Sequence, residues 1–140
     1  MWCGQSIKKI KMHFRIRNFT IFAIVLSFLS GCGNSQPVHI EPGKVSCAHC
    51  SMSIVDMRFH TQTLTSKGRR YHFDSIECYY HFHEKIGGQS KKVWMSNFQN
   101  PNEYLDEDHA FIIKSNQIRS PMGEGYAAFK SKYDYDSIFQ

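Results

Sequence analysis

Hydrophobic and polar residues alternate with a period of two in three stretches of the chain, 59–65, 70–73 and 91–96. Because β-branched and aromatic residues are frequent in them, these stretches are predicted to be β-strands. The four residues between the first two stretches include a glycine and indicate a turn, so the two strands are expected to form a hairpin. We expect His60 and His72 to lie at the surface of this hairpin.

A helical period follows the hairpin. Cys78, Phe82 and Ile86 recur four residues apart, which predicts the apolar face of an α-helix. Asp74 and Glu77 precede this face with the spacing of a capping box, and two glycines after Ile86 predict the end of the helix. The first half of the domain therefore has the order strand, strand, helix, strand.

The second half begins in the same way. Residues 99–102 have the composition of a linker, strands are predicted over 110–113 and 126–129, and a short helix is predicted to begin after residue 130. The closing strand of a second such unit is missing from the pattern. We therefore expect an α+β fold with small, mostly antiparallel sheets and an incomplete second unit.

An apolar run, 19–29, follows a basic stretch near the start of the chain. It is too short to cross a hydrocarbon layer of about 30 Å as a helix, but its length and basic flank are typical of a secretory signal peptide. The run ends at Leu29-Ser30-Gly31-Cys32, which resembles the lipoprotein box in which the cysteine is acylated. We expect a signal peptide over 1–31 and a lipidated linker over 32–44.

This leader predicts the location of the protein. Lipidation of Cys32 would attach the mature chain to a membrane of the cell envelope, facing the periplasm. The outer membrane is preferred over the inner membrane.

The formal net charge of +5 comes from the leader. Residues 1–31 hold five of the 17 Lys and Arg and no acidic residue, which leaves 12 basic against 12 acidic residues in the rest of the chain. A neutral remainder gives no basis for nucleic-acid binding. Hydrophobic residues make up 41% and charged residues 21% of the chain, which excludes wholesale disorder.

A short segment at the start of the domain, Cys47-Ala-His49-Cys50-Ser-Met52, is rich in soft metal ligands. Thiolate and thioether sulfur select Cu(I), whereas oxygen ligands select Mg²⁺ or Ca²⁺. Met122 stands in a glycine-bounded turn, where its sulfur can be exposed. Cys78 lies on the predicted helix and is either a core residue or a further ligand. The segment therefore indicates a site for a soft metal ion.

Two alternatives use the same residues. Cys47, Cys50, Cys78 and His81 form a Cys₃His set, the ligand type of a zinc-stabilised structural or interaction module. The Cys-x-x-Cys pair is also compatible with an envelope thiol-disulfide protein, although no strand precedes it as in thioredoxin-like units. Phosphate-binding loops, nucleophile elbows and HExxH motifs are absent from the sequence, so no enzymatic activity is expected.

The order of these motifs resembles the NosL family, lipoproteins of the nitrous-oxide reductase gene cluster that act as copper chaperones. The resemblance covers about residues 45–130 of a predicted metal-binding domain, 45–140. It rests on Cys32, Cys50-Ser-Met52-Ser-Ile54, Lys67-Gly68, His72-Phe73-Asp74-Ser-Ile76-Glu-Cys78, Ser120-Pro121-Met122-Gly123 and Tyr126-Ala-Ala-Phe129.

The resemblance implies two tandem ββαβ units and delivery of Cu(I) to nitrous-oxide reductase or its maturation machinery. It also implies that Cys50, Met52 and Met122 are the copper ligands. Cys47 adds a thiol to this pattern, which allows either a site with two cysteines or a disulfide. The residues themselves add His49 and Cys78 to the candidate metal ligands.

Overall fold

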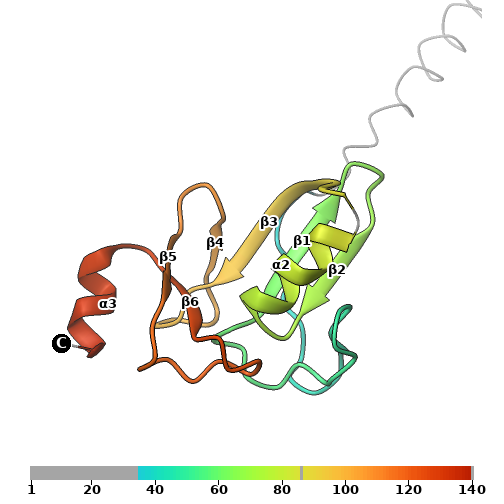
Figure 1. Cartoon of the computed structure of the whole chain (residues 1–140). Coiled ribbons are helices and arrows are strands. Elements are labelled where there is room, and N and C mark those ends of the chain that lie inside the picture. Colours follow the sequence, from blue (N-terminus) through green and yellow to red (C-terminus); the bar gives the residue numbers. More distant parts are fainter. Residues whose placement is uncertain (1–34, 86, 140) are drawn as a thin grey trace, which may run out of the picture. The chain divides into compact units, whose positions relative to one another are not determined.

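The computed structural model describes residues 35–85 and 87–139 (Figure 1). The predicted signal peptide and Cys32 lie outside the described residues. No helix in the described part of the chain is both long and apolar enough to cross a membrane. In chain order the elements are β1 (Thr61–Thr65), β2 (Arg70–Phe73), α2 (Ile76–Lys85), β3 (Ser90–Ser96), β4 (Tyr104–Asp106), β5 (Phe111–Lys114), β6 (Tyr126–Phe129) and α3 (Lys132–Phe139).

The first sheet has the strand order β2-β1-β3-β4, and each neighbouring pair is antiparallel. β1 and β2 form the predicted hairpin, whose turn contains Gly68 with a φ of 79°. Glycine adopts this left-handed conformation without a steric cost. β1 begins two residues later than predicted, because the N–H groups of Phe59 and His60 bond to carbonyls of the preceding turn.

β4 is the strand that the sequence does not predict. Its three residues are too few to show an alternation. The segment before it folds back on itself, because the N–H of Asn97 bonds to the carbonyl of Glu103 at 2.9 Å. This return places β4 along the edge of β3, with Leu105 opposite Met95.

The second sheet is the hairpin of β5 and β6. Tyr135 and Phe139 of α3 pack with Phe129 of β6 in a second apolar cluster. A hydrogen bond of 2.9 Å from the N–H of Phe98 to the carbonyl of Ala128 joins this half to the first sheet. The α+β fold with antiparallel sheets is therefore confirmed, with the order ββαββ through the first sheet and the order ββα over the rest of the described chain.

Ser75, and not Asp74, caps the N-terminus of α2. Its hydroxyl oxygen accepts the N–H of Cys78 at 3.3 Å, as an N-cap side chain does. The capping-box prediction was wrong for Glu77 as well, because its carboxylate accepts hydrogen bonds from the second half of the domain. The helix ends as predicted, where the N–H of Gly88 bonds to the carbonyl of His83 at 3.2 Å.

The main core lies between α2 and one face of the first sheet. Burying an apolar side chain of this kind stabilises the fold by roughly 1.5–3 kcal/mol, so the apolar stripe of α2 fixes the helix against the sheet. Cys78 is carried into the core with it. The principal members of this cluster are Ile54, Phe73, Ile76, Cys78, Tyr79, Val93 and Met95.

The opposite face of the sheet is polar but covered. His60 is fully buried, contrary to its expected surface position, with its Nδ1 2.8 Å from the Tyr104 hydroxyl and its Nε2 3.1 Å from Nδ1 of His72. The backbone of Val38 exchanges two hydrogen bonds, of 2.9 and 3.0 Å, with the side chain of Gln62. The described part of the predicted linker therefore contacts the sheet.

Candidate metal centre

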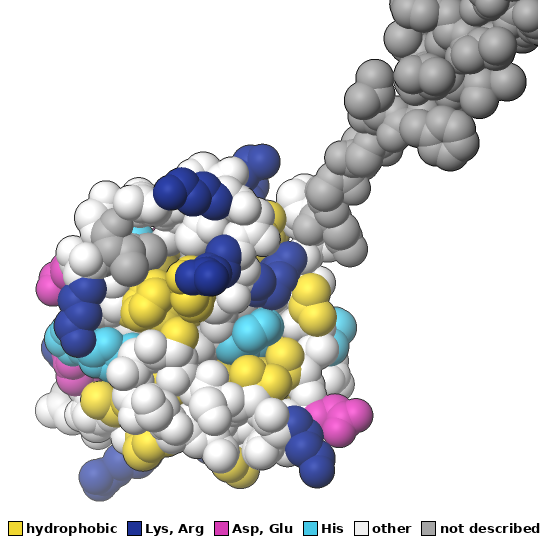
Figure 2. Space-filling view, turned by 90° about the vertical axis from the view of Figure 1, so that its right-hand side faces the viewer, with side chains coloured by type: hydrophobic (Ala, Val, Ile, Leu, Met, Phe, Trp, Pro, Cys, Tyr) yellow, Lys and Arg dark blue, Asp and Glu magenta, His cyan; other side chains and the backbone are white. Residues whose placement is uncertain are grey.

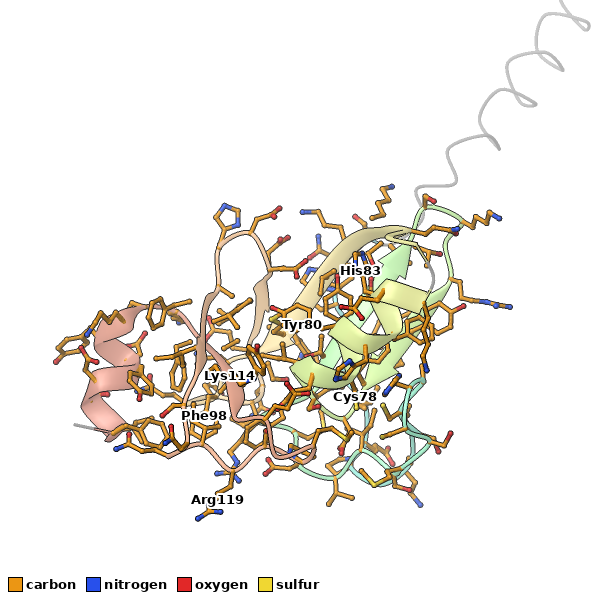
Figure 3. All side chains as sticks on the ribbon, in the orientation of Figure 1. Cys78, Tyr80, His83, Phe98, Lys114 and Arg119 are labelled. Carbon is orange, nitrogen blue, oxygen red and sulfur yellow. The ribbon has the colours of Figure 1, made fainter. Side chains whose placement is uncertain are left out.

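The sulfur atoms of Cys47, Cys50 and Cys78 converge, with every pair within 4.8 Å (Figure 3 shows Cys78 on α2). All three are free thiols. Cys47 and Cys78 are 2% and 0% exposed, whereas Cys50 is half-buried. Within the described residues, no other three side chains of His, Cys, Asp or Glu bring their ligand atoms so close together.

A tight loop brings the first two cysteines together. The N–H of Cys47 bonds to the carbonyl of Met52 at 2.8 Å, and the N–H of Ser51 bonds to the carbonyl of Cys47 at 3.0 Å. Ser51 closes the loop with a φ of 65°, which is costly for a residue with a Cβ. The N–H of Ala48 bonds to the carbonyl of His72 at 2.9 Å, which fastens the loop to the end of β2.

The third cysteine comes from the first turn of α2. Cys78 is the third residue after the Ser75 cap, so its position follows from the start of the helix. The N-terminus of a helix carries a partial positive charge, which favours a thiolate nearby. The cluster of three cysteines is thus built from one loop and one helix start that are joined through β2.

The three thiols differ in acidity. A hydrogen bond from the Cys78 thiol, with backbone N–H groups of Cys50, Asp74 and His49, lowers the pKa of Cys47 to about 4 despite its burial. The same hydrogen bond raises the pKa of Cys78, and burial raises the pKa of Cys50. The Cys78 hydrogen bond therefore favours a thiolate on Cys47, and a bound cation would displace the remaining thiol protons.

Two histidines border the cysteines. The rings of His49 and His81 stack with centroids 5.5 Å apart and 26° between their planes. Nδ1 of His49 is buried and has no hydrogen-bond partner within the described residues. Nε2 of His81 lies 2.9 Å from a carboxylate oxygen of Glu124. His49 therefore retains an unused nitrogen, while His81 is held by the second half of the domain.

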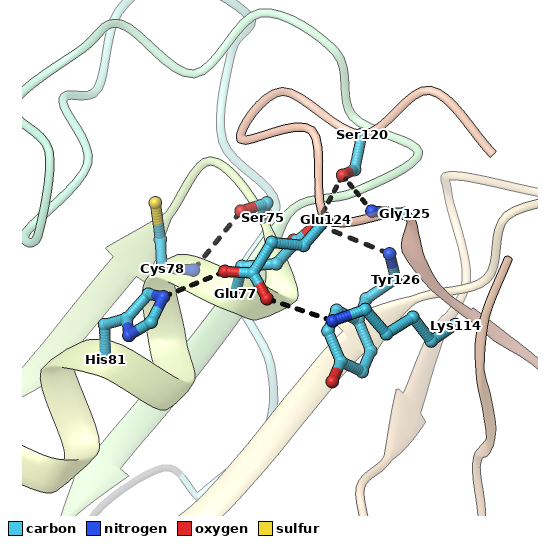
Figure 4. A network of polar contacts seen from close by, with 9 residues as sticks. All are labelled: Ser75, Glu77, Cys78, His81, Lys114, Ser120, Glu124, Gly125 and Tyr126. Carbon is cyan, nitrogen blue, oxygen red and sulfur yellow. Dashed lines mark hydrogen bonds and ion pairs between the residues drawn. The ribbon is translucent and has the colours of Figure 1, made fainter. Parts of the chain in front are cut away.

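Glu77 ties the first turn of α2 to the loop that carries Met122 (Figure 4). Its side chain is 1% exposed, and Oε1 accepts hydrogen bonds from the hydroxyl of Ser120 and, at 3.3 Å, from the N–H of Tyr126. The Ser120 hydroxyl oxygen in turn accepts the N–H of Gly125 at 2.9 Å. Sequence spacing cannot reveal this contact, because Glu77 and Ser120 stand 43 residues apart.

Both candidate methionines lie at the surface. Met52 is 47% exposed and Met122 is 39% exposed, so neither side chain is packed in the hydrophobic core. Met122 occupies a turn that is closed by a 3.0 Å hydrogen bond from the N–H of Gly123 to the carbonyl of Ser120. Their thioethers remain predicted ligands. The side of the molecule in Figure 2 shows histidine side chains among hydrophobic ones.

No protein-family model matches the chain, and no curated protein matches it either. A solved structure shares its fold, the copper chaperone NosL from Shewanella denitrificans, with a TM-score of 0.63. The match covers 74% of this chain and 85% of that chain at 19% sequence identity. At this identity the likeness establishes the fold, and that protein is described as a chaperone rather than as an enzyme.

Proposed function

We propose that this protein is a copper chaperone of the cell envelope that binds Cu(I) through Cys47, Cys50 and Cys78. The convergence of three free thiols within 4.8 Å carries the proposal. The NosL-like fold supports it. We further propose that acylated Cys32 attaches the protein to the membrane, and that nitrous-oxide reductase or its maturation machinery receives the copper.

Cu(I) is the cation that suits this ligand set best. Thiolates are soft donors, and the lowered pKa of Cys47 favours its thiolate form. The buried sulfurs of Cys47 and Cys78 would shield the ion from water. Cys50 is half-buried, so an incoming ligand can approach the ion from its side of the cluster. These features fit a site that holds copper and also releases it.

The methionines and His49 fit a role in transfer. Thioether sulfur binds Cu(I) without a proton to lose, so Met52 and Met122 can hold the ion weakly while a thiolate leaves. Both side chains are exposed, which puts them within reach of a docked recipient. His49 offers its unpartnered Nδ1 as a further ligand.

A zinc-stabilised module is the second candidate, and the unpartnered Nδ1 of His49 favours it. With Cys47, Cys50 and Cys78, that nitrogen would complete a Cys₃His set only after the His49 side chain moves closer, because it lies outside the group of ligand atoms that are within 4.8 Å of one another. His81 is less suited to this place than the sequence suggested, because Glu124 engages its Nε2. A structural zinc site would make folding depend on the metal.

Competition with the Cu(I) chelator bathocuproine disulfonate under anaerobic conditions tests the proposal. We expect one Cu(I) per chain and a loss of at least about tenfold in affinity for the serine variant of each of Cys47, Cys50 and Cys78. Ser53→Ala, at an exposed position of the same loop, is the matched control and should bind normally. Unfolding by zinc chelators without a preference for Cu(I) would favour the zinc module, and unchanged Cu(I) affinity in all three variants would refute the copper site.

A further inference from the structure

Basic side chains gather at one end of the first sheet. The strand register places Leu64 opposite both Arg70 and Lys92, and the β1–β2 turn follows immediately. α2 ends just before Ser90, which pairs with Thr65 at this same end. Figure 2 shows several Lys and Arg side chains close together over one end of the domain. We call this surface the basic end, and it comprises Lys67, Arg69, Arg70, Lys85, Lys91 and Lys92.

Most of this charge has no opposite charge paired with it. Among the described residues, Lys92 forms an ion pair with Asp106 at 2.8 Å, and the other five members form none. The nearby acidic side chains are Glu84, Asp106 at the end of β4, and Glu107 and Asp108 just after it. The last three lie at the sheet edge opposite β2, where they line one surface pocket with Lys91 and Lys92. The remaining ion pairs among the described residues involve Arg58, His81, Lys114, Lys130 and Lys132. The basic end is therefore positive on its β2 side.

The chain enters the domain beside the basic end. The guanidinium of Arg70 lies 5.1 Å over the ring of Trp94 and donates a 2.7 Å hydrogen bond to Gln62. The same guanidinium donates at 2.8 Å to the carbonyl of Gln36. Gln36 stands four residues after Cys32, a distance of at most about 14 Å for a fully extended chain. Lipid on Cys32 would therefore keep this end close to the bilayer.

We propose that the basic end docks on the anionic phospholipid head groups of the membrane that holds the anchor. This inference rests on the lipid anchor of the proposed function, but it does not depend on the identity of the bound metal. Attraction between basic side chains and an anionic surface acts within about one Debye length, 8–10 Å. A tether of at most about 14 Å lets the charges come within that range of the bilayer surface.

Docking in this manner would turn the cysteines away from the bilayer. β2 leads from Arg70 at the basic end to Phe73 beside the cysteine loop, and α2 then runs back from Ile76 to Lys85 (Figure 1). A helix of 10 residues spans about 15 Å, so the metal centre and the basic end lie at opposite ends of α2. A membrane-bound chaperone would thus offer its copper to recipients in the aqueous space.

Amine footprinting of the mature, lipid-anchored chain tests the docking. The protein is reconstituted in vesicles of phosphatidylcholine, with or without phosphatidylglycerol, and a water-soluble acylating reagent modifies its lysines. We expect the modification rates of Lys67 and Lys91 to fall by about threefold or more when phosphatidylglycerol is present, and to recover at high salt. Lys44, which precedes the cysteine loop, is the internal control and should react at the same rate in both vesicles.

Matched charge reversals locate the surface. In the double variant Lys67→Glu/Lys91→Glu, phosphatidylglycerol should no longer slow the acylation of Lys85. Lys44→Glu/Arg119→Glu changes the net charge by the same amount, at two positions that form no ion pair among the described residues. Arg119 lies away from the basic end, because its neighbour Ser120 bonds to the first turn of α2. This control should retain the protection of Lys85.

Three results would overturn the docking proposal. Equal rates for Lys67 in the two vesicles would show that anionic lipid is not recognised, and equal protection of Lys44 would place the contact elsewhere. Protection reproduced by inorganic phosphate at constant ionic strength would identify a free anion as the ligand. The intact mass reports acylation of Cys32, and Cu(I) titration reports the metal centre, so failure of docking is distinguishable from failure of the proposed function.

Discussion

Acid should destabilise the fold through His60. Burial, with the neighbouring His72 and His39, lowers the pKa of His60 from 6.5 to about 3. Between these values the unfolded chain binds one more proton than the folded protein, so the stabilisation is complete above pH 6.5 and is lost as the pH falls. Each pH unit below 6.5 costs about 1.4 kcal/mol, so the loss at about pH 5 is about 2 kcal/mol from this side chain.

Urea unfolding of the reduced, metal-free protein at about pH 7.5 and pH 5 measures this loss. His60→Gln lacks the titrating group and should lose about 2 kcal/mol less than the wild-type protein over this interval, whatever its stability at neutral pH. His109→Gln removes an exposed histidine between β4 and β5 and should behave as wild type. Identical acid losses in the wild-type and His60→Gln proteins would refute the reasoning.

Three further substitutions test the contacts around the metal centre. Glu77→Ala leaves two hydrogen-bond donors of the second half without their acceptor, so unfolding free energy measured in urea should fall by about 2–3 kcal/mol, with little change in the exposed Glu84→Ala control. Met122→Leu should weaken Cu(I) binding about tenfold in chelator competition, whereas Met57→Leu, at a position packed against the core, should not. Ser51→Val places a branched side chain at a φ of 65°, so it should cost about 1–2 kcal/mol of stability and also lower Cu(I) affinity. Normal Cu(I) binding in Met122→Leu would contradict the role of Met122 as a copper ligand. Normal Cu(I) binding in Ser51→Val would contradict the role of Ser51 in shaping the cysteine loop.

Local sequence patterns were sufficient to predict those strands whose bounds depend on neighbouring residues alone. The bounds of β2 and β6 agree with the predicted strands, because alternation and the flanking turns define them. The spacing of Cys47 and Cys50 was also enough to suggest a shared site. Cys78 was left open between core and ligand, since its approach to the loop depends on how β2 and α2 pack.

The remaining features depend on contacts between distant residues. β4 exists because the chain folds back along β3. Its three residues are too few to show the alternation of hydrophobic and polar positions that would predict a strand. His60 looked like a polar surface position because alternation shows which face a residue occupies and not what covers that face. Residues near Val38 cover it. Glu77 has the spacing of a capping residue, yet its carboxylate bonds to Ser120.

X-ray absorption at the copper edge, on the protein loaded anaerobically with one equivalent of Cu(I), examines the metal centre most directly. Cys47, Cys50 and Cys78 should give a first shell dominated by sulfur, with about three scatterers per copper. Substitution of all three cysteines by serine should abolish that shell while α2 and the sheets persist by circular dichroism. A shell of nitrogen and oxygen atoms, or a sulfur shell that survives the triple substitution, would contradict the account.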